Sequence, residues 1–204
     1  MPEGDINHAV DLFKSRDVKK RREAIDLAAS LDSREAAALM IKALQDQSWS
    51  LREYAIGKGA DLGSPLVGPL CRLLRSGVWY SRAAAVKVLE LIGDRRALMP
   101  LSAVLGDGNR SVADAAKSAF AALLGSADAG QLQILMQGTA EPARKRFIDA
   151  VAAIKPELGV QMAGGEAAGN EDPSGEDAGQ TLQQLRSVLK SASKQEPKYE
   201  EDES

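Results

Sequence analysis

Few residues in this sequence could perform catalysis, because it contains one histidine and one cysteine. His8 precedes Ala9, and a single imidazole cannot build a histidine-rich metal centre. Cys71 follows Leu70 in an apolar stretch without an adjacent base, so we expect a packed thiol and not a nucleophile. The sequence therefore predicts no catalytic residue, no metal ligand and no cofactor.

Residues 57–63 contain three glycines and Lys58, which is a composition also found in nucleotide-binding loops. A phosphate-binding loop of that kind follows a strand and opens a helix. Here Gly59 falls on the apolar face of a helical segment, so we interpret the stretch as part of a helix. Because glycine in a helix interior costs on the order of 1 kcal/mol relative to alanine, we expect this helix to be a soft joint.

Basic and aromatic side chains at matched positions of successive helical segments are the candidates for partner binding. These candidates are Lys14, Lys42, Arg72, Arg75, Trp49 and Trp79. The basic residues either form a solvated helix face or receive an acidic or amphipathic peptide. The two tryptophans each stand three residues before an arginine, where they either staple a turn or anchor a partner.

Arginine recurs in a further column, three residues before an apolar helix residue in each unit. The column consists of Arg21, Arg52, Arg82 and Arg144, with Ala113 in the fourth place. Guanidinium groups bind carbonyl and carboxylate oxygens well. We interpret the column as a structural ladder in which each arginine bonds loop carbonyls or an aspartate of the adjacent unit, and ligand binding is the alternative. Asp46 and Asp107 end matched units, where we expect turn formers or caps.

A repeat of about 31 residues must position all of these side chains. The trio Leu70, Leu73 and Leu74 has the i, i+3, i+4 spacing of one helix face and returns 31 residues later. Between such trios lies a second set with i, i+4, i+7 spacing, for example Ala85 and Leu89. Two types of helix therefore alternate, about ten in all, and the predicted class is all-α.

The most regular unit carries the pattern of a known repeat. Its matching positions are Arg82, Ala85, Gly93, Asp94, Arg96, Ala97, Pro100 and Leu101. This unit resembles the short HEAT-like repeat that is also found in phycobiliprotein lyases. The resemblance covers residues 6–155 and implies a right-handed α-solenoid of about 4.5 helical hairpins, whose second helices line a concave face. Since lyases, hydroxylases and adaptors share such repeats, the resemblance indicates an architecture and not an activity.

Composition divides the chain into a repeat domain and a tail. Residues 1–157 hold 22 Lys/Arg against 19 Asp/Glu, whereas the remainder holds 4 against 10. We expect a flexible linker at 158–178, a short amphipathic helix at 179–192 and an acidic disordered tail at 193–204. The apolar face of that short helix would consist of Leu182, Leu185, Val188 and Leu189. A helix this short needs a surface to fold against.

These observations favour a non-catalytic scaffold or adaptor that binds a protein or peptide on its concave face, in bacterial signalling or complex assembly. The chain's own segment 179–192 is one candidate occupant. Two alternatives stay open, a subunit that resembles the bilin lyases and a nucleic-acid-binding protein, although the repeat domain lacks the strong positive charge of nucleic-acid binders. Without a secretory signal or a membrane-length apolar run, we expect a cytoplasmic protein with no membrane insertion.

Overall fold

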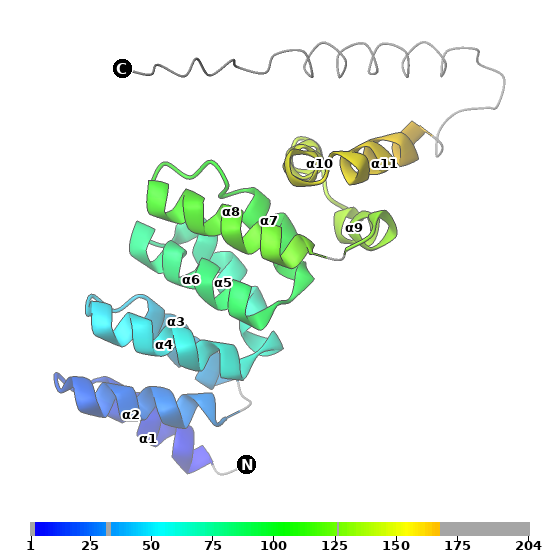
Figure 1. Ribbon diagram of the computed structural model, residues 1–204. Helices are drawn as coiled ribbons and strands as arrows, with labels where there is room; N and C mark the ends of the chain where they lie inside the picture. The colour runs from blue at the N-terminus through cyan, green and yellow to red at the C-terminus, as the bar shows by residue number, and fades with distance from the viewer. Residues whose placement is uncertain (1–2, 32–33, 126, 168–204) are drawn as a thin grey trace, which may run out of the picture. The chain divides into compact units, whose positions relative to one another are not determined.

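The computed structural model describes residues 3–31, 34–125 and 127–167, and every regular element in these ranges is a helix (Figure 1). The predicted all-α class is confirmed for this part of the chain. The helices are α1 (Glu3–Phe13), α2 (Val18–Ala29), α3 (Arg34–Leu44), α4 (Trp49–Leu62), α5 (Ser64–Ser76), α6 (Trp79–Ile92), the 3₁₀ turn η1 (Arg95–Ala97), α7 (Leu98–Ser102), α8 (Arg110–Leu124), α9 (Ala129–Met136), α10 (Ala143–Ile154) and α11 (Pro156–Ala167).

The helices from α1 to α8 pack as two series. Consecutive helices pair, α1 with α2, α3 with α4, α5 with α6 and α7 with α8. In addition, α2 contacts α4, α4 contacts α6, and α6 contacts α8. In the other series, α1 contacts α3, α3 contacts α5, and α5 contacts α7. Figure 1 shows the even-numbered series side by side. One sequence repeat therefore corresponds to one odd-numbered and one even-numbered helix.

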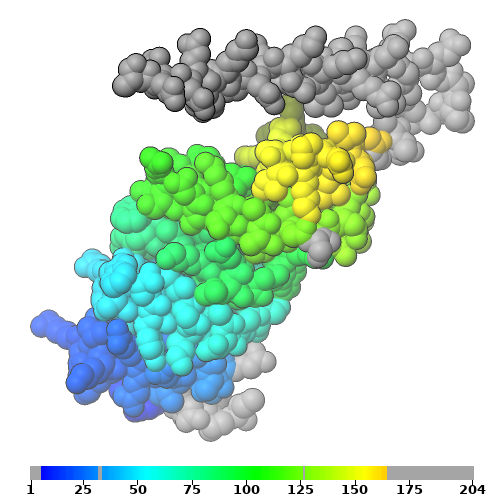
Figure 2. Space-filling view, in the orientation of Figure 1, coloured from blue at the N-terminus to red at the C-terminus, as the bar shows by residue number. Residues whose placement is uncertain are grey.

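The core runs through the interior between the two series. Leu70, Leu101 and Leu132, which occupy equivalent places in the sequence repeat, lie on α5, α7 and α9 and are all completely buried. Aromatic packing contributes at one point, where the rings of Phe120 and Phe147 meet edge to face with centroids 6.0 Å apart. Side chains of successive even-numbered helices adjoin from blue to green in the space-filling view (Figure 2). Burial between neighbours therefore holds this part of the chain together.

Glycines end three of the even-numbered helices. Gly63, Gly93 and Gly125 are the C-caps of α4, α6 and α8. The first two have φ of 63° and 73°, a left-handed conformation that a residue with a Cβ adopts only at a cost. These two turns allow the chain to reverse from an even-numbered helix into the next odd-numbered one.

The predicted linker at 158–178 is wrong in its first part, because α11 continues to Ala167. Glycine serves close packing here: a Cβ on Gly159 would lie 2.4 Å from the Cβ of Ala152 on α10. Met162, on the same helix, is completely buried. The compact unit that contains the core ends at Ala163. The rest of the predicted linker, the amphipathic helix at 179–192 and the acidic tail at 193–204 lie outside the described residues.

Candidate interaction site

A groove of about 860 Å³ lies between α3 and α5, which are neighbours in the odd-numbered series. Three cationic side chains line it, Arg34 and Lys42 from α3 and Arg72 from α5. Ile41 and Leu73 provide apolar surface between them. None of the described residues that line the groove is acidic, so the groove combines an apolar floor with a positive rim.

The local sequence of α3 explains the hollow. Its lining residues recur at intervals of three or four positions, as residues on one helix face do. Two of them are the alanines Ala37 and Ala38, whose short side chains leave space that larger residues would fill. The charged residues flank this small-residue stretch on the same face, so the helix presents both features to the groove.

Two prolines shape the α5 wall. Pro65 and Pro69 both line the groove. Because α5 begins at Ser64, directly after Gly63, Pro69 lies in the helix interior. Because proline has no N–H group, the carbonyl oxygen of Pro65 lacks the helical donor that residue 69 would otherwise supply. The α5 wall therefore carries two proline rings and lacks one helical hydrogen bond.

The structure brings two of the predicted binding residues together and separates two others from them. Lys42 and Arg72 line the same groove. Lys14 instead lies beyond α1 and donates a hydrogen bond of 2.8 Å to the exposed carboxylate of Asp11. Arg75 is exposed on α5 but is not among the lining residues. Arg34 was missed, although it stands two helical turns before Ile41 and so shares its face.

The two tryptophans open α4 and α6 and are largely exposed. Their exposed fractions are 68% for Trp49 and 50% for Trp79. Trp49 stands four positions after Gln45, and Trp79 stands three positions after Ser76. Both Gln45 and Ser76 line the groove. The ring of Trp79 packs edge to face against Tyr80, with centroids 5.7 Å apart. Both indoles therefore retain large apolar surfaces, although neither is among the residues that line the groove.

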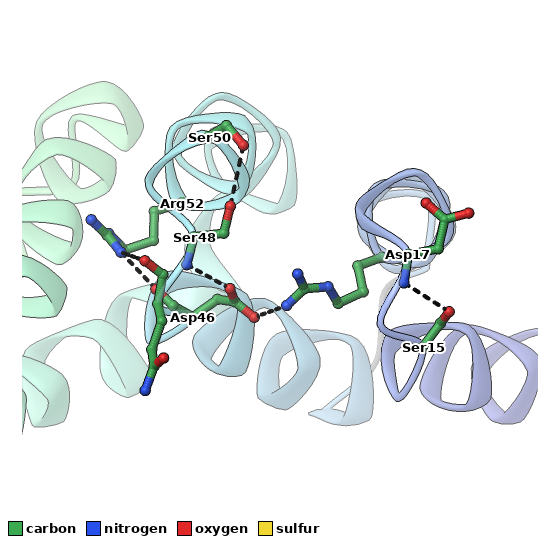
Figure 3. Close-up of polar contacts among 8 residues, drawn as sticks. Ser15, Asp17, Asp46, Ser48, Ser50 and Arg52 are labelled. Atoms are coloured by element: carbon green, nitrogen blue, oxygen red, sulfur yellow. Dashed lines mark hydrogen bonds and ion pairs between the residues drawn. The ribbon is translucent and has the colours of Figure 1, made fainter.

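Two arginines of the predicted ladder bind aspartates of the next unit. Arg21 donates through Nη1 to Asp46 Oδ2 (Figure 3). Arg82 binds Asp107 through two hydrogen bonds, from Nε at 2.8 Å and from Nη2 at 2.7 Å. Each aspartate also accepts a backbone N–H bond of 2.8 Å two residues further along its loop. The hydrogen bonds from Arg82 hold the pKa of the Asp107 carboxyl below its usual value.

Arg52 has a different environment from those two. Its Nη1 donates to the carbonyl oxygens of Asp46 and Gln47, at 2.7 and 3.0 Å (Figure 3). Its guanidinium carbon lies 4.4 Å from the centroid of the Tyr80 ring, which is a cation–π distance. Of the remaining ladder positions, Arg144 is half-buried on α10, and Ala113 is buried on α8.

Other reactive groups form no recognisable catalytic arrangement in the described ranges. Cys71 is half-buried on α5, and burial raises the pKa of its thiol, with a smaller contribution from the charge of Asp94. A raised pKa keeps the thiol protonated at neutral pH, which makes it a weak nucleophile. His8 is exposed on α1. No group of three His, Cys, Asp or Glu side chains in the described residues could hold a metal ion.

No family model matches the chain, and no curated protein matches it. Among the helices of residues 3–167, none is both long and apolar enough to cross a membrane. The function must therefore be inferred from the geometry of the groove and of the surface around it.

Proposed function

We propose that this protein is a non-catalytic interaction scaffold, a short right-handed α-solenoid of the HEAT-like type. Its α3–α5 groove would bind an acidic, amphipathic segment of a partner protein. One observation carries this proposal, the lining of the groove, in which Arg34, Lys42 and Arg72 surround an apolar floor without an acidic residue among the described lining.

The packing of the helices supports the scaffold part of the proposal. Each helix pair buries its apolar face mainly against the preceding and following pairs. Such an array leaves an extended outer surface along each series of helices, and proteins built in this way use that surface to bind partners. The groove lies on the odd-numbered series, which consists of the second helices of the HEAT-like units.

The dimensions and the charge of the groove support the choice of partner. The 11 residues of α3 span about 16 Å, so an occupant that lies along it would be a helix of about three turns. Apolar residues at i, i+3, i+4 and i+7 of that helix would contact Ile41 and Leu73. Its carboxylates would face the exposed cations, and since exposed ion pairs contribute only about 0.2–1 kcal/mol each, these charges serve mainly orientation and association rate.

Photo-crosslinking in cells that produce the protein tests this proposal. A photoreactive residue replaces Ala38, which is exposed and lines the groove, and in a control it replaces Ala121, which is exposed on α8. We expect an adduct from position 38 only. Its cross-linked peptide should be acidic and amphipathic, and the double substitution K42E/R72E should abolish the adduct.

Three results would contradict the proposal. Equal adducts from both positions would show that contact with position 38 is unspecific. An adduct that survives K42E/R72E, or that maps to a basic segment, would remove charge complementarity as the basis of binding. An adduct with residues 168–204 of this chain would replace the partner protein by the chain's own tail.

A further inference from the structure

Arg52 differs from Arg21 and Arg82 in the residue that lies opposite it in the next unit. Six residues before each ladder position on the following even-numbered helix, the loop or helix end holds an equivalent position. These positions are Ser15, Asp46, Ser76 and Asp107, and Gly138 follows α9 in the same way. Arg21 binds Asp46, and Arg82 binds Asp107. In the pair of Ala113 and Gly138, both charges are missing together. Among the four pairs that begin at Arg21, Arg52, Arg82 and Ala113, that of Arg52 with Ser76 keeps the arginine without a carboxylate opposite it.

Comparison of Arg82 with Arg52 shows which edge of the Arg52 guanidinium is not used by the contacts to the loop. Arg82 uses Nη1 for the carbonyl of Gly77, at 2.7 Å, and its Nε–Nη2 edge for the carboxylate of Asp107. Arg52 likewise uses Nη1 for loop carbonyls. Its other terminal nitrogen points away from that loop in Figure 3. The hydroxyl of Ser76 does not bind Arg52 and donates instead to the carbonyl oxygen of Arg72 at 3.3 Å. No carboxylate among the described residues forms an ion pair with Arg52.

One position of this incomplete pair belongs to the α3–α5 groove. Ser76, the last residue of α5, is a lining residue, whereas Arg52 stands on α4 beside the groove lining and not within it. Trp49 precedes Arg52 by three residues on α4, which places both on one side of that helix. The Tyr80 ring that covers one face of the guanidinium is in contact with Trp79. Arginine and exposed tryptophan are the residue types that dominate binding energy at interfaces.

We infer that Arg52 is the carboxylate-binding position of the groove. An aspartate or glutamate of the docked partner segment binds the Nε–Nη2 edge of Arg52, in the place that Asp107 takes for Arg82. The apolar residue next to that carboxylate lies against the indoles of Trp49 and Trp79. This inference rests on the proposed function, and it names the residue of this chain that selects an acidic side chain at one defined position of the segment.

A matched pair of substitutions at Ser76 tests the inference. In the full chain with the photoreactive residue at position 38, S76D supplies the missing carboxylate internally, while S76N has the same shape without the charge. We expect S76D to raise the midpoint of thermal unfolding relative to S76N. We also expect S76D to reduce the adduct yield about tenfold, the loss that corresponds to one charge-assisted hydrogen bond, and S76N to change it less than about twofold.

A third variant identifies the partner of the new carboxylate, because Arg72 stands one helical turn before position 76. When Arg52 is replaced by glutamine, the difference in unfolding midpoint between S76D and S76N should disappear. A difference that persists in R52Q would mean that the carboxylate pairs with Arg72, which would overturn the inference.

The remaining outcomes separate the inference from the proposed function. If S76D raises the unfolding midpoint but leaves the adduct unchanged, Arg52 does not bind the partner and only the inference fails. Equal losses of adduct with S76D and S76N would indicate a steric effect and would also overturn the inference alone. Absence of any adduct from position 38 in the unsubstituted protein would overturn the proposed function together with the inference.

Discussion

The link between Arg82 and Asp107 joins the start of α6 to the loop before α8. Side chains of these two residues are only 22% and 9% exposed, so water screens the pair less than it screens surface ion pairs. Asp107 also fixes its own loop by accepting the backbone N–H of Asn109. One carboxylate therefore determines both the turn and the contact between successive units.

Replacement of Asp107 by asparagine should lower the free energy of unfolding by about 2 kcal/mol at neutral pH, because two charge-assisted hydrogen bonds are weakened. Urea denaturation followed by circular dichroism measures this change. The matched control is D114N on α8, where the side chain is 56% exposed and the expected loss is below about 0.5 kcal/mol. Losses of equal size in the two variants would contradict the structural role of Asp107.

The same link makes the stability depend on pH in a defined direction. The pKa of Asp107 is lower in the folded protein than its ordinary value of 3.8. Its contribution is therefore complete above the pKa of the unfolded state and is lost as the pH falls through the lower folded value. We expect the difference between wild type and D107N to be largest at neutral pH and to shrink below about pH 4. A difference that grows towards acid would be contrary evidence.

Much of this residue-scale chemistry was visible in the sequence, but the exception at Arg52 was not. The recurrence of arginine every 30 or 31 positions predicted a column, and charge chemistry suggested carbonyls or aspartates as its partners. Ser76 escaped notice because the units differ in length by one residue, so that a step of 31 from Asp46 falls on Gly77. The next ladder position shows the equivalence, because Asp46 precedes Arg52, Ser76 precedes Arg82 and Asp107 precedes Ala113 by six residues each.

At the scale of one element, α4 is distinguished by two glycines in different environments. Gly57 is exposed, and a Cβ there would meet no atom within 4 Å. Gly59 is buried, and a Cβ there would lie 3.1 Å from Val88 Cγ1 and 3.4 Å from Leu66 Cδ2. The first glycine therefore only weakens the helix, whereas the second allows α4 to approach its neighbours.

Substitution of each glycine by alanine should have opposite effects. G57A should raise the free energy of unfolding by about 0.5–1 kcal/mol, the usual gain from alanine in a helix interior. G59A should lower it, because Val88 is completely buried and has little room to move. Hydrogen exchange should be faster in residues 51–62 than in residues 82–92, and G57A should slow it. Equal exchange in the two helices would show that α4 is not a soft joint.

The sequence pattern predicted most helices and missed features that depend on exact helix ends. Periodic leucine and alanine gave the alternation of two helix types because these residues fill the core at regular intervals. Nothing in the sequence shows that α5 begins as early as Ser64 and that Pro69 therefore falls in the helix interior. Residues 158–178 are rich in small and acidic residues without a periodic apolar pattern, which predicts a linker. The helix that occupies the start of this range depends instead on Gly159, which allows the close approach to Ala152.

At the scale of the whole molecule, the compact unit extends past the boundary that composition suggested. A chain that ends at residue 157 loses the buried Met162 and the partly buried Leu158, which packs against the main core. Compared with a chain that ends at residue 167, it should be less stable by about 3 kcal/mol, the cost of losing such core side chains. Parallel urea denaturations of the two chains measure the difference.

Two single substitutions in the full chain serve as controls for this comparison. M162A should lower the free energy of unfolding by about 2 kcal/mol or more. V160A should change it little, because Val160 on the same helix is 54% exposed. If both substitutions have the same small effect, α11 does not belong to the cooperative unit.

The groove marks the limit of what the sequence could predict about the whole molecule. Lys42 and Arg72 were recognised as a basic pair because they occupy matched positions of two repeats. The space between their helices depends on how closely α3 and α5 approach, and no residue pattern gives that distance. Arg34 was missed for the same reason, since its relevance appears only when the two helix faces form one surface.

The placement of Trp49 and Trp79 at the openings of α4 and α6 has an optical consequence. They are the only tryptophans of the chain, and both indoles already lie largely in water. Their emission maximum should therefore shift little when the protein denatures. A bound molecule that covers these rings would move the emission maximum to shorter wavelengths. Tryptophan fluorescence should therefore report binding at Trp49 and Trp79 well, and it should report unfolding poorly.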